Sequence, residues 1–270
     1  GWCTSVQNPN RGPWTGSIST DGADQYNTQT KSTSVYFLDS IELNPQWLLD
    51  LGVRWDKFDT EQTMIAGRYN STYSEGTITR AESDTDFINY QAGLTFKPVE
   101  NGSIYASYAT SANPVGVDAG DGSEGIGEAY SNLDPEESRT FEVGTKWDLF
   151  DDRLNLTAAI FRTEKQNARI QLDSTTYANI GESKVDGFEL GLNGNITDKW
   201  AASLGYTYLD SEQTDPGPSC TRAGVCTYPN AAKGKRLPNV PENSATLWTT
   251  YDLTPAFTVG AGAVAMDKVY

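Results

Sequence analysis

Two cysteines in one polar segment carry the clearest chemical signal in this sequence of 270 residues. Cys220 and Cys226 lie six positions apart in the segment SCTRAGVC. This spacing predicts a local disulfide if the compartment is oxidising, and two free thiols if it is reducing. Cys3 has no partner that the sequence identifies. The three cysteines match no zinc-binding spacing, and we predict no metal site.

Carboxylates are the other groups that could do chemistry. The segment 112–137 is rich in glycine and carboxylates and contains no lysine or arginine. Its DAGDGSEG motif lacks the ligand order of an EF-hand, so we expect a solvated acidic loop, with weak calcium binding as the alternative. Glu142 and Glu189 could form a catalytic pair, which is the less favoured use of them. The chain has no histidine and no hydrolase, P-loop or zinc-protease motif, so we predict no catalytic residue and no cofactor.

Composition excludes further classes of protein. The net charge is −16, with 36 acidic residues against 20 basic ones, which argues against nucleic acid as a partner because phosphate binding needs a basic surface. The mean hydropathy is −0.53. No run of about 18 apolar residues occurs, so no transmembrane helix is expected. A membrane-spanning strand escapes this test, because only every second residue of it faces lipid.

The elements that must position these groups are segments that alternate in polarity with a period of two. Four such segments of about ten residues lie between Ser138 and Leu209. In an earlier segment, one face is apolar and the other is polar or charged, which suits lipid on one side and water on the other. The apolar face holds Trp47, Leu49, Leu51, Val53 and Trp55, and the polar face holds Asp50, Gly52, Arg54 and Asp56. On the preceding segment Asp39 and Glu42 fall on different faces, so one of them breaks the pattern or lies near a rim.

The connections between these segments alternate strictly between short and long. Short turns fall near 44–46, 98–102, 151–152, 197–198 and 254–255, and long loops near 60–85, 112–137, 167–184 and 211–241. This rhythm predicts an all-β fold, a transmembrane antiparallel β-barrel with about ten strands in this chain. Trp47, Trp147, Trp200 and Tyr208 fit its interfacial girdles. The alternative is a soluble sandwich, for example a secreted carbohydrate-binding or adhesion protein.

Three motifs resemble the strand pairs of TonB-dependent outer-membrane receptors. They are LDPEESRTFEVGTKWDLFDDRLNLTAAIF (133–161), KVDGFELGLNGNITDKWAASLGYTYLDS (184–211) and LPNVPENSATLWTTYDL (237–253). Within that family, NPNRGPWTGSIS, the TKSTSVYFLDSIEL hairpin and the paired loop cysteines are similar to Fiu-type catecholate siderophore receptors. The resemblance covers nearly all of the chain.

The resemblance implies that residues 1–270 are part of a barrel of about 22 strands, with the plug domain and the closing strands outside the chain. It implies no enzyme but active transport of a ferric siderophore, of the catecholate type, across the outer membrane of a Gram-negative bacterium. The expected partners are the siderophore, outer-membrane lipid and lipopolysaccharide, and the TonB complex through the missing N-terminal region. A receptor for another ligand and a porin-like channel are the alternatives within the fold.

The resemblance also points to candidate ligand-binding residues. Ferric catecholates are anionic and aromatic, so their sites should offer arginine or lysine beside aromatic rings. Loop residues of these types are Arg11, Trp14, Arg68, Tyr69, Tyr73, Arg80, Arg222, Tyr228, Lys233, Lys235 and Arg236. The alternative for each is an ordinary loop charge or a contact to a lipopolysaccharide phosphate.

Overall fold

A computed structural model describes residues 22–70, 72–116, 126, 133–172, 176–221 and 224–269. The predictions for Cys3, Arg11, Trp14 and Arg222 lie outside these residues. No helix within the described ranges has the length and apolar character needed to cross a membrane.

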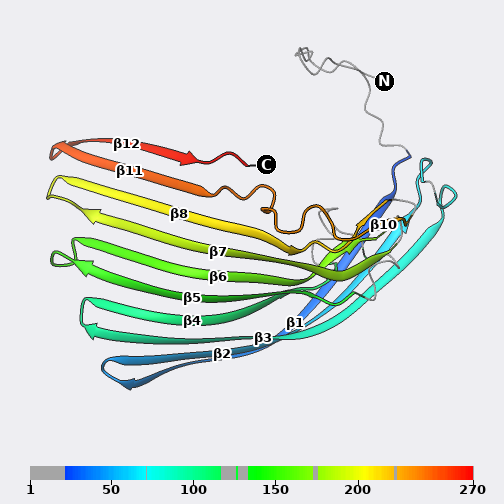
Figure 1. Ribbon diagram of the computed structural model, residues 1–270, viewed down its shortest axis with the longest axis horizontal. Coiled ribbons are helices and arrows are strands. Elements are labelled where there is room, and N and C mark those ends of the chain that lie inside the picture. Colours follow the sequence, from blue (N-terminus) through cyan, green and yellow to red (C-terminus); the bar gives the residue numbers. More distant parts are fainter. Residues whose placement is uncertain are drawn as a thin grey trace, which may run out of the picture.

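The described chain forms one antiparallel sheet of ten strands, as the sequence predicts (Figure 1). Its order is β1-β2-β3-β4-β5-β6-β7-β8-β11-β12, so the strands of this sheet pair in the order in which they follow one another along the chain. The two-residue strands β9 (Ser219–Cys220) and β10 (Cys226–Thr227) form a separate hairpin in the β8–β11 loop. The ten strands are β1 (Gln25–Asn44), β2 (Trp47–Ile65), β3 (Ile78–Val99), β4 (Gly102–Asn113), β5 (Glu136–Leu149), β6 (Leu154–Gln171), β7 (Tyr177–Asn195), β8 (Trp200–Asp215), β11 (Asn243–Thr254) and β12 (Phe257–Met266).

Short turns lie at one end of the sheet and long connections at the other (Figure 1). Two of the predicted loops are wrong in extent. Strands β2 and β3 pair as far as Ile65 with Ile78, so the loop predicted at 60–85 is only 66–77. Likewise β6 and β7 pair as far as Gln171 with Tyr177, inside the loop predicted at 167–184. These extensions lie beyond the apolar band and carry many polar side chains, so the point where the apolar alternation stops is not the point where the strands end.

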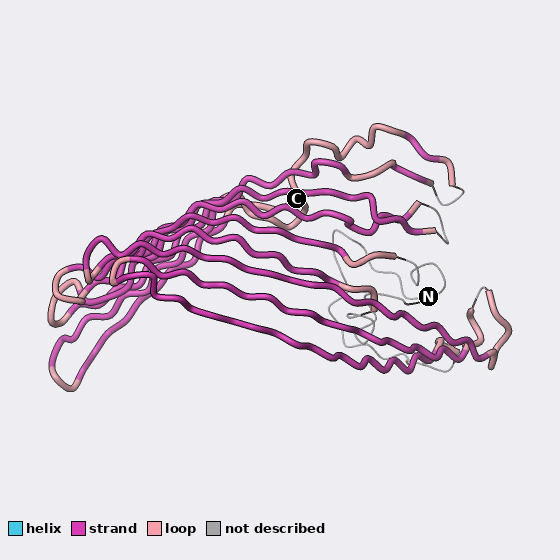
Figure 2. The backbone as a smooth tube through the Cα atoms, turned by 90° about the horizontal axis from the view of Figure 1, so that it is seen from below, coloured by secondary structure: helices cyan, strands magenta, loops and turns pink. Residues whose placement is uncertain are grey.

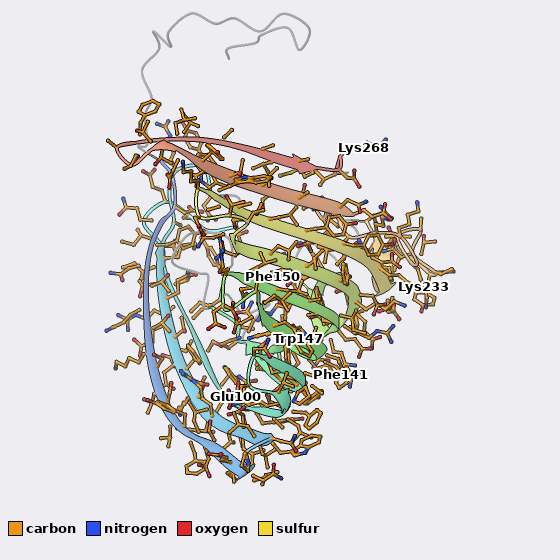
Figure 3. The ribbon with its side chains drawn as sticks, turned by 90° about the vertical axis from the view of Figure 1, so that its left-hand side faces the viewer. Glu100, Phe141, Trp147, Phe150, Lys233 and Lys268 are labelled. Carbon is orange, nitrogen blue, oxygen red and sulfur yellow. A yellow bond between two sulfur atoms is a disulfide. The ribbon has the colours of Figure 1, made fainter. Side chains whose placement is uncertain are left out.

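The exposed fractions of side chains on the two faces of the sheet distinguish a membrane-spanning barrel from a soluble sandwich. On β2, the polar row holds the buried side chains Asp56, Thr60 and Gln62, which are 4%, 2% and 8% exposed. The apolar row on the other face is open, with Val53 45% exposed. A soluble sandwich would bury that row, whereas a barrel turns it to lipid. Figure 3, which looks along the strands from the short-turn end, shows the sheet curved into an open arc with side chains on both faces.

Strand register resolves the two acidic residues of β1. Asp39 lies opposite Leu51, in the middle of the apolar row, and Phe37 and Ile41 flank it on the same face. Glu42 lies opposite Leu48 on the polar face. Asp39 therefore breaks the apolar pattern at its centre and does not lie near a rim.

Aromatic residues border the apolar row at both ends. At the short-turn end, Trp47 packs against Phe96 with ring centroids 4.7 Å apart, and Trp147 and Trp200 face the same side on later strands. At the loop end, Tyr208 lies opposite Phe188. This arrangement is the one expected of interfacial girdles.

Candidate functional site

The predicted loop residues form two groups at the loop end of the sheet. We call Arg68, Tyr69 and Tyr73 the β2–β3 loop group, and Tyr228, Lys233, Lys235 and Arg236 the β8–β11 loop group. The loop position predicted for Arg80 is wrong, because Arg80 lies in β3 opposite Thr63. The sheet order places β4, β5, β6 and β7 between the strands that carry them, so the structure does not bring the two groups together. Figure 2 shows the long connections at this end of the sheet, opposite the short turns.

The β2–β3 loop is fixed by hydrogen bonds to the chain that precedes β1. Asp24 accepts hydrogen bonds from the Gly67 amide (2.8 Å) and from the Asn70 side chain (3.0 Å). The Tyr69 amide donates to the Gly22 carbonyl at 3.2 Å. These bonds hold the loop while its rings stay in solvent, with Tyr69 80% exposed. The loop thus combines a hydrogen-bonded backbone with exposed aromatic side chains.

Within the β8–β11 loop, the predicted Cys220–Cys226 disulfide joins β9 to β10, with an S–S distance of 2.10 Å. The loop folds back on the end of β8, where the Gln213 amide donates to the Lys235 carbonyl at 2.8 Å. Lys233 projects at the loop end (Figure 3), and no carboxylate pairs with it or with Lys235 among the described residues.

Arg236 is less available than the two lysines of this loop, because its guanidinium forms an ion pair with Glu242 at 2.5 Å. The hydrogen bond from Arg236 lowers the pKa of the Glu242 carboxyl below its usual value. We therefore assign Arg236 first to holding the loop against the start of β11.

The polar face of the sheet, which we call the inner wall, holds on β1 and β2 a cluster of hydrogen-bonded side chains that was not predicted from the sequence. Asp56 accepts hydrogen bonds from Arg54 Nε at 2.9 and 2.8 Å and from Ser34 Oγ at 2.6 Å. Arg54 Nη2 also donates to Ser34 Oγ at 2.9 Å. Asp56 is buried, while the Arg54 side chain is 52% exposed. The buried carboxylate therefore fixes a guanidinium whose outer edge is open to the polar face.

A cavity of about 370 Å³ lies beside this guanidinium. A Cβ on Gly52 would lie 2.7 Å from Leu38 Cδ2 and 2.8 Å from Gln91 Cγ, so only glycine lets the flanking side chains approach over it. The combination of a cation, a phenol ring and amides suits an anionic aromatic ligand. The residues that line the cavity include Tyr36, Leu38, Arg54, Asn89 and Gln91.

The position of Arg54 in the sequence could have identified it as a candidate. Arg54 stands in the polar row of a strand whose other row is apolar, which is where a lumen-facing cation must stand. The predicted ligand-binding cations are all placed in loops, so the prediction did not include Arg54.

Farther toward the short turns, a second set of polar contacts crosses the inner wall. The Tyr105 hydroxyl donates to Glu142 Oε1 at 2.5 Å, and Lys146 Nζ lies 5.4 Å from the centroid of the Tyr105 ring. Gly144 makes room for that ring, since a Cβ there would be 2.5 Å from Tyr105 Cζ. Glu142 is thus engaged in a wall contact.

Comparison with known proteins identifies the family. The model described as "TonB dependent receptor-like, beta-barrel" matches residues 2–269. The probable TonB-dependent siderophore receptor PiuA of Acinetobacter baumannii is 58% identical over all of this chain, which covers 35% of that relative. The catecholate siderophore receptor Fiu of Escherichia coli is 32% identical over 96% of this chain and 35% of that relative.

Solved structures agree with this assignment. The crystal structure of PiuA from Acinetobacter baumannii matches with a TM-score of 0.88 at 58% identity, over 100% of this chain and 37% of that one. The closed form of Fiu from E. coli K12 matches with a TM-score of 0.76 at 29% identity, over 97% and 37%. The chain spans about a third of the length of its curated relatives, at 35% of PiuA and of Fiu, and both are named as receptors. The chain belongs to the TonB-dependent receptor β-barrel family.

Proposed function

We propose that the protein containing this chain resides in the outer membrane of a Gram-negative bacterium and takes up a ferric siderophore with energy supplied through TonB. The 58% identity to a probable siderophore receptor over the whole chain carries this proposal. Residues 1–270 would contribute to the barrel, and the plug and the region that contacts TonB would lie elsewhere in the protein.

The proposed ligand class is a ferric catecholate. Support comes from the 32% identity to a receptor named for catecholates and from the chemistry of the inner wall. The cavity beside Arg54 offers a fixed guanidinium and the Tyr36 ring, which suit a ligand that is both anionic and aromatic. The two loop groups would make the first contacts, and the cavity would receive the ligand below them.

Lipopolysaccharide is the proposed partner on the outer face. Beyond the apolar row, outward positions become charged, with Lys57 2.8 Å from Asp84 and Arg162 2.6 Å from Asp186. Such charges lie at the level of lipid head groups, where phosphates and divalent cations can contact them.

Uptake of radiolabelled iron by cells that carry the full-length gene tests the proposal. A ferric catecholate and a ferric hydroxamate are compared, with a TonB-deficient strain as the control. We expect uptake of the catecholate that is lost without TonB. TonB-dependent uptake of the hydroxamate alone would refute the catecholate assignment, and a lack of TonB-dependent uptake of either would refute siderophore transport.

A further inference from the structure

Strands β3 and β4 pair over only part of their length. Their register runs from Val99 opposite Gly102 to Gln91 opposite Ala109, and it stops there. Beyond that point β3 continues from Tyr90 to Ile78, paired to β2 alone. We call the space between this part of β3 and the end of β4 (110–113) the β3–β4 gap. Figure 1 shows the loop-side parts of β1, β2 and β3 curving away from the later strands.

The gap exposes a strand edge. The Tyr90 amide donates to Thr110 Oγ1 at 3.0 Å, which shows that its N–H points toward β4. Alternate residues of a strand direct their N–H and C=O groups to the same side. The main-chain groups of Arg80, Glu82, Asp84, Asp86 and Ile88 therefore point into the gap, where no backbone partner is found in the described chain. This edge is about 27 Å long.

A cavity of about 550 Å³ lies at the base of the gap. It is lined from the inner face by Phe87 and Asn89 and from the outer face by Asp86 and Tyr108. It lies at the loop end of the apolar row, where Ile88 is still 60% exposed. In the orientation proposed above, a molecule outside the cell reaches this edge without entering the lumen.

The charges of the side chains that line this cavity indicate what kind of molecule it could bind. Four carboxylates border the cavity, those of Asp86, Asp134, Glu137 and Glu164, against the single guanidinium of Arg139. Arg139 already binds Glu164 at 2.6 Å. The three remaining carboxylates have no ion-pair partner among the residues that the structure describes, so a cationic occupant complements this surface.

The described part of the β4–β5 connection covers a different surface. Val115 and Ile126 are 2% and 0% exposed and pack with Ala81 and Leu133. Ala81 belongs to the alternate set of β3 residues, whose side chains face inward. These described contacts lie on the inner face of β3 and do not involve its edge.

We propose that the β3–β4 gap binds an extended segment of a cationic protein or peptide, which adds to β3 as a further strand. Main-chain hydrogen bonds to Arg80, Glu82, Asp84, Asp86 and Ile88 would supply the part of the affinity that does not depend on the sequence of the bound segment. Lysine or arginine at alternate positions of the segment would meet Asp86, Asp134 and Glu137. The proposal rests on the outer-membrane orientation given above and is independent of the transported cargo.

The test uses the purified full-length receptor in detergent and a labelled nine-residue peptide of alternating lysine and valine, with binding followed by fluorescence anisotropy. Two comparison peptides separate the contributions. One replaces lysine by glutamate, and the other carries N-methyl groups on alternate amides and cannot donate those hydrogen bonds. We expect the lysine peptide to bind, and each comparison peptide to bind at least about tenfold more weakly.

A matched pair of receptor variants isolates the strand edge. The amide of Glu82 points into the gap, so Glu82→Pro removes a gap-side donor without breaking the β2–β3 ladder. Glu82→Gln removes the same charge and keeps the donor. We expect the proline variant to bind the lysine peptide about tenfold more weakly than the glutamine variant. Folding is checked by the heat-dependent shift in electrophoretic mobility, and the N-methylated peptide keeps the test valid if the proline variant does not fold.

Equal binding of the three peptides by the wild-type receptor would overturn the proposal. So would a wild-type receptor that takes up iron yet binds none of them. Loss of iron uptake together with normal peptide binding would instead count against the proposed transport function alone.

Discussion

The indole Nε1 of Trp55 donates a hydrogen bond to Asp86 Oδ2 at 3.0 Å, where the outward row of the sheet changes from apolar to charged. One position farther along the same row, Lys57 contacts Asp84 and Asp59 at 2.8 and 3.4 Å. Trp55, the last aromatic residue of the apolar row of β2, is thus hydrogen-bonded to Asp86, a carboxylate on the neighbouring strand β3. This contact marks the upper edge of the lipid-facing band.

Leu51 lies near the middle of that band. Replacing Leu51 with arginine should lower the free energy of unfolding of the full-length receptor in lipid vesicles by about 2–4 kcal/mol, because the charge would face hydrocarbon. Asp59→Arg, beyond the band on the same face, should cost about 0–1 kcal/mol. Denaturant titration of both variants checks the prediction, and equal costs would contradict the assignment of the membrane level.

Asp39 should be a source of instability, since it lies opposite Leu51 on the lipid face. We expect Asp39→Leu to raise the free energy of unfolding in vesicles by about 1 kcal/mol. Asp50 accepts a hydrogen bond from Ser40 at 2.5 Å on the polar face, so Asp50→Leu should give no such gain. A loss of stability in Asp39→Leu would indicate a partner for the carboxylate in the complete barrel.

Tyr105 and Gly144 should be energetically coupled. A methyl group at Gly144 would displace the Tyr105 ring and break its hydrogen bond to Glu142, so Gly144→Ala should cost about 1–3 kcal/mol. In a Tyr105→Ala background the same change should cost much less, because the methyl group then has space. A double-mutant cycle on unfolding free energies measures this, and additive costs would contradict the contact.

Arg54 should contribute to ligand affinity. We expect Arg54→Gln to weaken binding of a ferric catecholate about tenfold or more, through loss of a charged contact. Lys57→Gln removes one positive charge three residues farther along β2, on the opposite face, and should leave affinity nearly unchanged. Quenching of tryptophan fluorescence in the purified receptor reports both affinities, and equal effects would show that only overall charge matters.

The ion pair of Arg236 and Glu242 predicts a pH dependence of the β8–β11 loop. The folded-state pKa of Glu242 is lowered, so this contact stabilises the loop above the pKa of an unfolded glutamate. That stabilisation is lost as the pH falls through the lowered folded-state pKa. Arg236→Gln should raise the pKa of Glu242 toward its ordinary value, which a carbon-13 NMR titration of the side-chain carboxyl can follow.

The sequence predicted the number and order of the strands and the sorting of short turns from long connections. Those features follow from the period of two and from turn residues, which are local properties. The same reasoning placed Arg54 and Asp56 on the polar face but did not identify them as a site. Their contact with Ser34 depends on the register between β1 and β2, which alternation alone does not determine.

The strand ends were predicted poorly for a physical reason. Beyond the apolar band β2 and β3 carry many polar side chains, so Thr60 and Ser83 look like loop residues although they form a ladder pair and are buried. The point where the β3–β4 pairing ends was not predicted either, because no local sequence signal shows where two neighbouring strands diverge. Arg11, Trp14 and Arg222 remain predictions, as does a ligand-binding role for each of the other loop residues.

The meander order of the sheet also bears on how such a wall forms. Every pairing joins successive strands of the ten-stranded sheet, so each new ladder closes only the connection between those two strands. Assembly can therefore advance one hairpin at a time, without waiting for distant segments to meet. For the same reason, gain or loss of one hairpin would change the circumference of a barrel while leaving the register of every other pair intact.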